Sequence, residues 1–442
     1  MTGTLVRFNA RTKDGLSACG FVLIALLMRL WHLSTPKGFV FDEVYYAKNA
    51  HSLVQHGVEL QSSGTSEFIV HPPVGKWLIG IGIKIFGFNE FGWRFSAAII
   101  GALSVGLIYL VARKLFDSYI FSCTAALLTL LDGLHLVHSR TALLDIFLMF
   151  FILLAFYLIL LSKPWWAGFV LGLALATKWS GIYYMVAFAA FLLYADYRHE
   201  RAMENENSVV NVLATKVWKR FIQFGVIPIS TYITSWIGWF ISPNGWDRNW
   251  SKSVIASFWH YHAEMWNFHT SLTQGHSYSA NPWSWLIMGR PTSFFYATPK
   301  GCGAASCSQE ILALGTPLLW WSGLIALFVT FGYWIARREW QSGLILLSMA
   351  AGYLPWFLIQ KRTMFTFYAI SFEPFLILLI TYVLSKFLER NEEGKVPRIR
   401  VYAFCVYLAA IAINFFYFIP LYMGSVITYS SWFSHMWLAS WI

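Results

Sequence analysis

Hydrophobic runs close to the length of a bilayer span recur along the whole chain. A transmembrane helix needs roughly 20 mostly apolar residues, because the hydrocarbon core of a bilayer is about 30 Å thick. Of the 442 residues, 57% are hydrophobic and only 12% are charged, whereas soluble globular proteins carry about 25% charged residues. Backbone groups that meet lipid must be hydrogen-bonded within their own segment, so such runs form helices. The sequence therefore predicts an all-α polytopic membrane protein.

We expect about eleven transmembrane helices, each near the length that a bilayer requires. Their approximate boundaries are 16–33, 93–112, 119–138, 143–161, 165–179, 181–195, 221–240, 312–335, 342–359, 366–386 and 401–420.

Lysine and arginine residues predict the orientation, because cytoplasmic loops carry an excess of them. With a cytoplasmic N-terminus, more than half of the 32 basic residues fall in short cytoplasmic stretches. Two long loops, 34–92 and 241–311, and the C-terminus are then extracytoplasmic. We find no repeat or second soluble domain, so residues 1–442 are expected to form one domain in the cell membrane. The net charge of +11 is scattered over separate loops, which argues against nucleic-acid binding.

Asp42 and Glu43 form an acidic pair shortly after the first predicted span. Ionisable residues beside hydrocarbon are costly and usually mark a functional site. The plainer alternative is a solvated helix start, where acids favour the helix dipole. The pair opens an amphipathic stretch, 43–56, and a second such stretch, 74–86, follows two prolines that suit a helix start. We expect both stretches to lie on the membrane surface and to hold the acids over a cavity.

Further ionisable residues fall on the same predicted side of the membrane. Arg140 and Asp145 lie in the turn between the third and fourth spans, where they can pair with each other. Lys361 and Arg362 end a span on the outside, where positive charge suits a lipid-linked phosphate. An Arg at the outer end of the second span can anchor a carboxylate or a phosphate. Together these ionisable residues predict a cavity that opens outward. The remaining residues on this predicted side are His71, Lys76, Arg94, His135, His138 and Lys178.

The second long loop carries histidines and two closely spaced cysteines. His260, His262, Glu264, His269 and His276 raise the question of a metal site, but their spacing matches no metal motif. Aromatic residues and histidines also suit sugar stacking and hydrogen bonds to phosphate, so both interpretations stay open, with no metal the favoured one. Cys302 and Cys307 lie beside glycines in a loop predicted to face an oxidising exterior, which favours a disulfide.

Several ordered motifs resemble the protein O-mannosyltransferases. They are Phe41-Asp-Glu-Val-Tyr-Tyr, His71-Pro-Pro-Val-Gly-Lys, Gly92-Trp-Arg-Phe-Ser-Ala, Ser139-Arg-Thr-Ala-Leu-Leu-Asp and Thr177-Lys-Trp-Ser-Gly. The stretch 276–285 and the small cysteine loop look like the bacterial, actinobacterial-type branch. Eukaryotic members carry a β-trefoil domain in the second long loop, which here has only about 70 residues. The chain also lacks a Gly-rich phosphate loop after a strand, so a nucleotide-linked donor is not supported.

The resemblance implies a GT-C-class membrane glycosyltransferase that transfers mannose with inversion. Its donor would be polyprenyl-phosphate mannose and its acceptor a Ser or Thr hydroxyl of an exported protein, which also suggests contact with the protein export machinery. The family's acidic pair falls on Asp42-Glu43 and its essential outer arginine on Arg94. No cofactor is required, because phosphate already leaves well; a divalent ion is possible chemistry but is not expected.

This resemblance, taken with the chemistry, assigns roles to the candidate residues. Asp42 is the expected general base, a role that contributes about 10²–10⁴-fold to a rate, and Glu43 is expected to hold the acceptor or to orient its neighbours. Positive or hydrogen-bonding groups are expected to offset charge on the phosphate; these are Arg94, Arg140, Lys361, Arg362, His262 and His276. Acceptor-binding or structural roles are expected for His71, Lys76 and Asp145.

Two other functions remain open at this point. Another GT-C enzyme, modifying a glycolipid or a wall polymer, would share the donor chemistry and the acidic pair. A transporter or flippase is the alternative of a different class. Transporters usually place charged sites near the bilayer midplane, on broken helices, whereas the charges here collect at one predicted surface.

Overall fold

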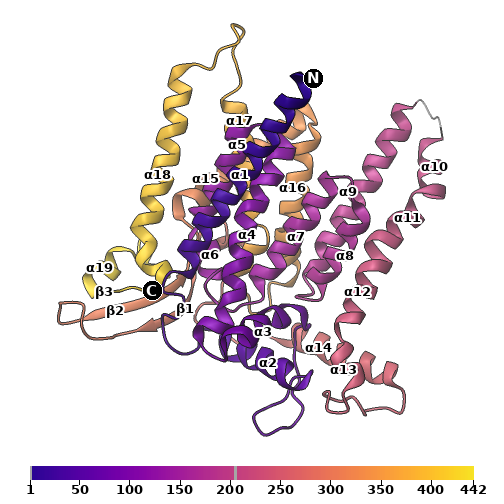
Figure 1. Cartoon of the computed structure of the whole chain (residues 1–442), viewed down its shortest axis with the longest axis vertical. Coiled ribbons are helices and arrows are strands. Elements are labelled where there is room, and N and C mark those ends of the chain that lie inside the picture. Colours follow the sequence, from indigo (N-terminus) through magenta and orange to yellow (C-terminus); the bar gives the residue numbers. More distant parts are fainter. Residues whose placement is uncertain (1, 204–206) are drawn as a thin grey trace.

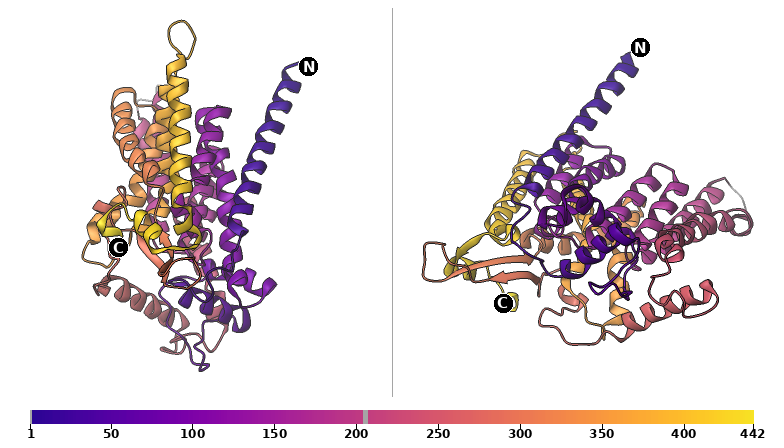
Figure 2. Two further views of the ribbon diagram at one scale, coloured as in Figure 1. Left: turned by 90° about the vertical axis from the view of Figure 1, so that its left-hand side faces the viewer. Right: turned by 60° about the horizontal axis from the view of Figure 1, so that its bottom comes forward.

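The computed structural model describes residues 2–203 and 207–442, with side chains from residue 12 onward. A bundle of helices forms the body of the molecule, with the N-terminus at one end (Figure 1). Short helices, a small sheet and the C-terminus lie at the other end, and Figure 2 shows the same separation from two further sides. The bundle helices are α1 (Thr2–Leu30), α4 (Glu90–Phe116), α5 (Tyr119–Leu130), α6 (Gly133–His138), α7 (Asp145–Leu160), α8 (Pro164–Leu175), α9 (Gly181–Ala202), α15 (Pro317–Arg337), α16 (Trp340–Tyr353), α17 (Glu373–Phe387) and α18 (Arg398–Met423).

The remaining elements connect or cap these helices. One connection runs through α10 (Ser208–Thr215), α11 (Val217–Phe221), the π-helical turn η1 (Ile222–Val226), α12 (Ile227–Ser235) and α13 (Ile237–Ile241). Two 3₁₀ turns, η3 (Leu354–Ile359) and η4 (Thr366–Ser371), flank the segment that leads into α17. At the capped end lie α2 (Glu43–His56), α3 (Val74–Phe86), α14 (Val254–Ser271), η2 (Pro282–Ser284), α19 (Tyr429–Ser434) and η5 (Ala439–Trp441).

Every predicted span coincides with a helix or a set of broken helices. Within the described residues, four helices are long and apolar enough to cross a membrane: α4, α15, α18 and the combined segment 340–359. Helices α5, α7 and α8 are apolar but shorter. The fold is thus that of a mostly helical, multi-pass membrane protein, and the number of eleven spans stays a prediction.

The predicted span 119–138 is not one helix. It breaks after α5, and Asp132 begins α6 by accepting a hydrogen bond from the backbone N–H of His135 at 3.1 Å. The same carboxylate accepts from the N–H of Thr316 and from Trp320 Nε1, both at 2.9 Å. A buried acid that caps a helix favours a new helix start over continuation, and hydropathy alone does not detect it.

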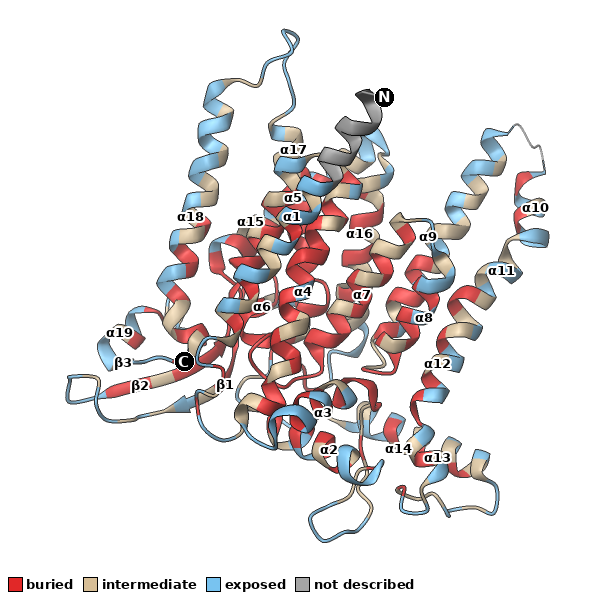
Figure 3. Ribbon diagram, in the orientation of Figure 1, coloured by how far each residue is buried: buried red, intermediate tan, exposed pale blue. Residues whose placement is uncertain are grey.

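Burial separates the helices that pack inside the protein from those that face its surroundings. In the apolar window of α4, 72% of the residues are buried, against 28% in α15 and in α18. Figure 3 shows the same contrast, with α4 and α7 largely buried, whereas α18 is mostly exposed in its first half and partly buried toward its C-terminal end. Since their exposed side chains are mostly apolar, the outer faces of α15 and α18 suit contact with lipid.

The two amphipathic stretches are the helices α2 and α3, as the sequence predicts. On α3 the buried residues include Ile79 and Ile83, whereas Ile81 and Ile85 are exposed. An apolar face turned outward at this end of the bundle is typical of helices that lie in the membrane interface.

The all-α prediction is wrong for the second long loop and the C-terminal tail. Strands β1 (Thr292–Ala297), β2 (Cys307–Ala313) and β3 (Val426–Thr428) form an antiparallel sheet in the order β1-β2-β3. The first two strands form a hairpin, and β3 arrives from the far end of the chain, where Thr428 pairs with Cys307. A strand partner more than a hundred residues away leaves no local sequence signal.

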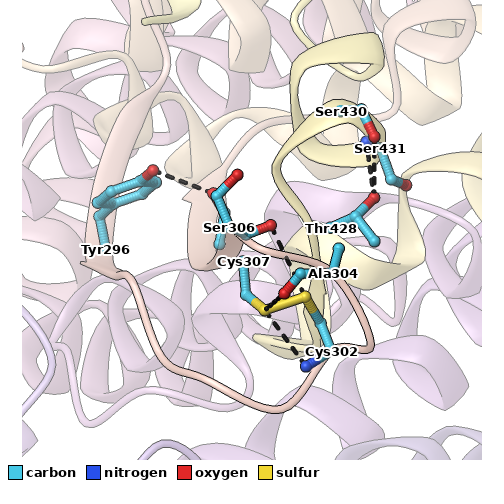
Figure 4. The surroundings of a disulfide bond; sticks show 9 residues. Tyr296, Cys302, Ala304, Ser306, Cys307, Thr428, Ser430 and Ser431 are labelled. Atoms are coloured by element: carbon cyan, nitrogen blue, oxygen red, sulfur yellow. Dashed lines mark hydrogen bonds between the residues drawn. A yellow bond between two sulfur atoms is a disulfide. The ribbon is translucent and has the colours of Figure 1, made fainter.

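A disulfide closes the end of this hairpin. Cys302 and Cys307 are bonded with their Cα atoms 5.8 Å apart, and the backbone N–H of Cys302 points to Cys307 Sγ at 3.2 Å (Figure 4). Beside it, the Thr428 hydroxyl accepts from the N–H of Ser431 and caps α19. The bridge therefore ties the hairpin end where the C-terminal tail joins the sheet.

We predict that this disulfide forms in the membrane-inserted protein. Protein denatured and alkylated without reduction should carry label only on the three free cysteines, Cys19, Cys123 and Cys405. Peptide mapping should then find Cys302 and Cys307 linked, and alkylated only after reduction. Label on both of these residues before reduction would contradict an oxidising environment for this loop.

Candidate active site

Asp42 stands at a sharp turn in the backbone, just before α2. The preceding residue, Phe41, has φ of +49°, a left-handed conformation that is uncommon and costly for a bulky residue. The Phe41 ring is held by a stack on Phe294 of β1, with centroids 4.8 Å apart and planes 11° apart. Tertiary packing thus holds the turn that presents Asp42, because such strain persists only where the surroundings impose it.

The carboxylate of Asp42 lies among charged groups of two other segments. Burial raises the pKa of Asp42 to about 6; the positive charge of Lys178 opposes this rise and the negative charge of Asp145 adds to it. No hydrogen bond to the Asp42 side chain is found within the described residues. A carboxylate with a raised pKa and an open hydrogen-bonding position is suited to accept a proton near neutral pH.

Glu43, the neighbour of Asp42, is in the opposite situation. Its side chain is 0% exposed and pairs with Arg94, which is 1% exposed. Arg94 Nε donates to one carboxylate oxygen at 2.8 Å and Nη2 to the other at 2.9 Å. The backbone N–H groups of Val40 and Ala142, both at 2.9 Å, and Trp93 Nε1 at 3.2 Å also donate to it. With five donors around it, this carboxylate joins α2, α4 and the 139–145 turn.

Arg94 and Arg140 hold the segment that leads to Asp42. The Nη atoms of Arg94 also donate to the carbonyls of Leu33, Pro36 and Gly38, so all five of its N–H groups have protein acceptors. Arg140 donates to carbonyls at the end of α1, those of Met28, Arg29, Trp31 and His32, as arginines do at helix C-termini. A phosphate would have to displace these carbonyls to reach the Arg94 guanidinium, and most of the Arg140 guanidinium is likewise directed at the end of α1.

The predicted Arg140–Asp145 pair does not form. Asp145 instead pairs with Lys178, whose Nζ lies 2.9 Å and 2.8 Å from its two carboxylate oxygens. The side chain of Asp145 is 4% exposed and that of Lys178 11%. Arg140 turns toward the unsatisfied carbonyls of α1, which are closer acceptors for it than the first residue of α7. Lys178, in the Thr177-Lys-Trp-Ser-Gly motif, is predicted from the sequence to line the outward cavity, but the sequence does not predict its pairing with Asp145.

A second group of side chains adjoins Asp42. His71 lies between Tyr46 and His269, with ring centroids 6.1 Å and 5.3 Å away. Burial lowers the pKa of His71 well below its usual value, and nearby Lys178 adds to this effect. Burial likewise lowers the pKa of His269 to about 4. Both imidazoles are therefore neutral near pH 7 and act as hydrogen-bonding groups rather than as cations.

Arg362 reaches this group and Lys361 lies at its rim. Arg362 Nε donates to the carbonyl of His269 at 3.1 Å, and Nη2 lies 3.4 Å from its Nδ1. Lys361 is exposed, and no protein partner for it is found within the described residues. Its positive charge is therefore accessible to a ligand.

Lys76 and Gly75 hold the start of α3 against its neighbours. The Lys76 ammonium is buried, pairs with Glu59 and donates to the carbonyl of His71 at 3.0 Å. A Cβ on Gly75 would lie 2.8 Å from Leu144 Cδ2 and 3.0 Å from Thr177 Cγ2. A larger side chain at position 75 would therefore press on both of the turns that carry Asp145 and Lys178.

The two predicted histidines of the second long loop differ in availability. His262 Nε2 lies 2.7 Å from the hydroxyl of Tyr232, and Nδ1 lies 2.8 Å from the carbonyl of Phe258. Both nitrogens are thus engaged by the protein. His276 is exposed, and its Nδ1 accepts from the N–H of Tyr278 at 3.1 Å. In the described part of the chain, no group of three or more His, Cys, Asp or Glu residues is placed to hold a metal ion.

His135 lies away from the candidate site. Its Nδ1 is 2.8 Å from Arg29 Nη2 and its Nε2 is 2.8 Å from the Ser104 hydroxyl, in a fully buried network. His138 is also fully buried, with its ring 5.7 Å from those of Phe294 and Phe367. The prediction that both line an outward cavity is wrong for His135, because the short helix α6 turns it into the core.

Comparison with known proteins assigns the family. Residues 70–215 match the model for dolichyl-phosphate-mannose-protein mannosyltransferases, and residues 254–441 match the C-terminal four-helix membrane region of protein O-mannosyltransferases. A Mycobacterium tuberculosis polyprenol-phosphate-mannose–protein mannosyltransferase is 34% identical over 99% of this chain and 93% of its own length. The chain belongs to this family.

Comparison with solved structures identifies the fold of the chain. The structure of the Saccharomyces cerevisiae protein O-mannosyltransferase Pmt1-Pmt2 complex bound to the sugar donor aligns with a TM-score of 0.80. The identity is 16%, over 97% of this chain and 93% of that one. The oligosaccharyltransferase AglB of Archaeoglobus fulgidus aligns with a TM-score of 0.55 and 15% identity, over 95% of this chain and 56% of that one. The protein mannosyltransferase therefore has a GT-C-like fold.

We predict that breaking the buried Glu43–Arg94 pair destabilises the protein strongly. Glu43→Gln leaves Arg94 charged and buried without a carboxylate, a change that typically costs about 3–5 kcal/mol. Thermal unfolding in detergent should show a large loss of stability. The matched control is Lys37→Gln in the same segment, whose partner Glu90 lies 3.6 Å away at the surface. Equal stability of the two variants would contradict the organising role of the buried pair.

Proposed function

We propose that Asp42 is the general base of the reaction that this protein catalyses. That reaction is transfer of mannose from polyprenyl-phosphate mannose to a Ser or Thr hydroxyl of a protein. The observation that supports the base is the contrast within the acidic pair: Glu43 accepts from five donors, whereas the Asp42 side chain has no protein hydrogen-bond partner in the described residues. A base must keep a free position for the hydroxyl whose proton it removes.

In the proposed reaction the sugar is transferred with inversion. Asp42 removes the proton of the acceptor hydroxyl while its oxygen attacks C1 of mannose. The bond between C1 and the phosphate oxygen breaks, and its electron pair stays on polyprenyl phosphate. Each elementary event has its own group: a base for the proton, and cations for the charge that grows on the phosphate.

Glu43, Arg94 and Arg140 act in this scheme as positioning residues. Together the two arginines donate to carbonyls from Met28 to Gly38, immediately before Asp42. Holding a reacting group in place is worth several kcal/mol in general. Donor binding is assigned instead to Lys361 and Arg362. The exposed His276 lies nearby, with its ring 5.0 Å from that of Phe365. The neutral His71 lies where it can hydrogen-bond an acceptor.

The proposed orientation puts this site outside the cytoplasm. Lys and Arg density favours a cytoplasmic N-terminus, and the site elements lie at the opposite end of the bundle from the N-terminus (Figure 1). The acceptors would then be exported proteins, met as they leave the export machinery. The donor would reach the site from the outer leaflet of the cell membrane.

The test of this function uses purified protein with polyprenyl-phosphate mannose and a Ser/Thr-rich peptide. Mass spectrometry should find a hexose adduct on a Ser or Thr residue. Transfer to a glycolipid or a wall polymer with an unmodified peptide would favour a different glycosyltransferase. Substrate flux in vesicles without any transfer would favour a transporter.

We predict that Asp42→Asn abolishes transfer but leaves donor binding largely intact, because the amide cannot accept the proton. In the wild type, Asp42 must be ionised to act, and burial raises its pKa to about 6. The transfer rate at saturating substrates should therefore fall as the pH drops through about 6 and level off above it. Asp42→Asn protein that transfers mannose at the wild-type rate would remove Asp42 from the mechanism.

We predict that replacing both Lys361 and Arg362 by Gln weakens donor binding more than peptide binding. Charge-assisted hydrogen bonds to the donor phosphate are worth about 1.5–3 kcal/mol each. The acceptor hydroxyl of the peptide is uncharged, so its binding depends much less on these cations. The measurement is KM for the donor against KM for the peptide. If KM for the donor stays unchanged, the two residues serve only as anchors at the membrane interface.

A further inference from the structure

The inference concerns which buried cation meets the donor phosphate, and it rests on the proposed function. Most of the basic residues near Asp42 are already engaged by the protein. Arg94 has acceptors for all five N–H groups, Arg140 donates to the carbonyls at the end of α1, and Lys76 pairs with Glu59. A phosphate needs an accessible cation that keeps at least one free donor and whose charge reaches the site of transfer.

Lys178 has one donor left over, and its side chain is more accessible than that of Lys76, at 11% against 1% exposed. Its ammonium has three N–H donors, and two hydrogen bonds, both to Asp145, are found within the described residues. Its Nζ also lies 5.2 Å from the ring centroid of Tyr368, over the ring. Its positive charge lowers the pKa of Asp42, His71 and His269. The ammonium therefore lies among the groups that surround the proposed base.

Burial makes this ammonium effective. The Lys178 side chain is 11% exposed, so water screens its charge poorly, and charge interactions are much stronger there than at the surface. Lys361, by contrast, is exposed. Of the two lysines, Lys178 is thus the one whose charge stabilises a phosphate more strongly, while Lys361 suits the first encounter at the rim.

Asp145 gives Lys178 a fixed position. Both carboxylate oxygens hold the ammonium, and Asp145 is the first residue of α7, where the helix dipole favours a negative charge. A flexible lysine side chain loses much rotamer entropy when a ligand fixes it. An anchor at its tip restricts that motion before the donor arrives, which is the general advantage of preorganisation.

We propose that Lys178 is a ligand of the donor phosphate and that Asp145 is its positioning residue. During transfer the C1–oxygen bond to phosphate breaks and its electron pair remains on the phosphate, which gains one negative charge. The hydroxyl proton goes to Asp42. In this step Lys178 neither gives nor takes a proton, and its positive charge offsets the charge that the leaving phosphate acquires.

The test compares Lys178→Gln, Lys178→Arg and Asp145→Asn with wild type, in the full-length protein. The readouts are KM for polyprenyl-phosphate mannose, KM for the peptide, and inhibition by the product polyprenyl phosphate. Loss of one charge-assisted hydrogen bond corresponds to about 10- to 100-fold in affinity. Lys178→Gln should raise KM for the donor and the inhibition constant of polyprenyl phosphate by about that factor. KM for the peptide should stay within about twofold of wild type.

The variants separate a phosphate ligand from a structural ion pair. Lys178→Arg keeps the charge and should recover most of the donor affinity, and Asp145→Asn should weaken donor binding less than Lys178→Gln does. Lys84→Gln, which removes an exposed lysine of α3, is the control and should change neither KM value. Lys178→Gln leaves Asp145 buried without its ion-pair partner and can therefore fail to fold. In that case the double variant Lys178→Gln/Asp145→Asn removes both charges and allows the same measurement.

Two results would overturn the inference. One is an unchanged donor KM and an unchanged inhibition constant in folded Lys178→Gln or in the double variant. The other is an equal rise of both KM values, which indicates a structural role. Failure of the proposed function is a separate outcome: wild-type protein would then bind polyprenyl phosphate, measured by thermal shift, without transferring mannose to the peptide.

Discussion

The ion pair between Glu43 and Arg94 is the interaction on which the geometry of the site depends. Both side chains are almost completely buried, and taking two charges out of water costs several kcal/mol for each ion. Here every N–H of Arg94 and both oxygens of Glu43 find partners. A complete network of this kind specifies one arrangement of the segments that it joins. Those segments are the end of α1, the start of α2, α4 and the turn before α7.

Adjacent carboxylates can serve different purposes when their environments differ. Glu43 enters the network and becomes part of the scaffold. Asp42, one residue earlier, is turned away from it by the left-handed backbone of Phe41, which the stack on Phe294 holds in place. Burial without a hydrogen-bond partner raises the pKa of Asp42 to about 6. The scaffold thus fixes the base in position without neutralising it.

The sequence predicted the parts that depend on local patterns. Hydropathy located the helical segments, amphipathic spacing identified α2 and α3, and the acidic pair identified the candidate base. It did not predict contacts between distant segments. β3 joins β2 from the C-terminal tail, and the break at Asp132 depends on Thr316 and Trp320. Asp145 pairs with Lys178 rather than with the nearby Arg140. An arginine motif reveals a buried charge but not whether its acceptor is a phosphate or a row of carbonyls.

The charge balance of the site explains how a buried site can support this reaction. Moving net charge into or out of a low-dielectric region is expensive. In the proposed transfer, the donor phosphate and Asp42 begin with one negative charge each. At the end the phosphate carries two, and protonated Asp42 carries none. The total is unchanged, and the negative charge has moved from the base to the phosphate. The proposed ligand Lys178 lies near Asp42 and binds the phosphate directly. Its positive charge therefore interacts favourably with the negative charge both before and after transfer. The interaction is stronger after transfer, when the charge is on the phosphate that the ammonium contacts. Such a group stabilises the product side of the transfer without trapping the base, because Asp145 shares its ammonium throughout.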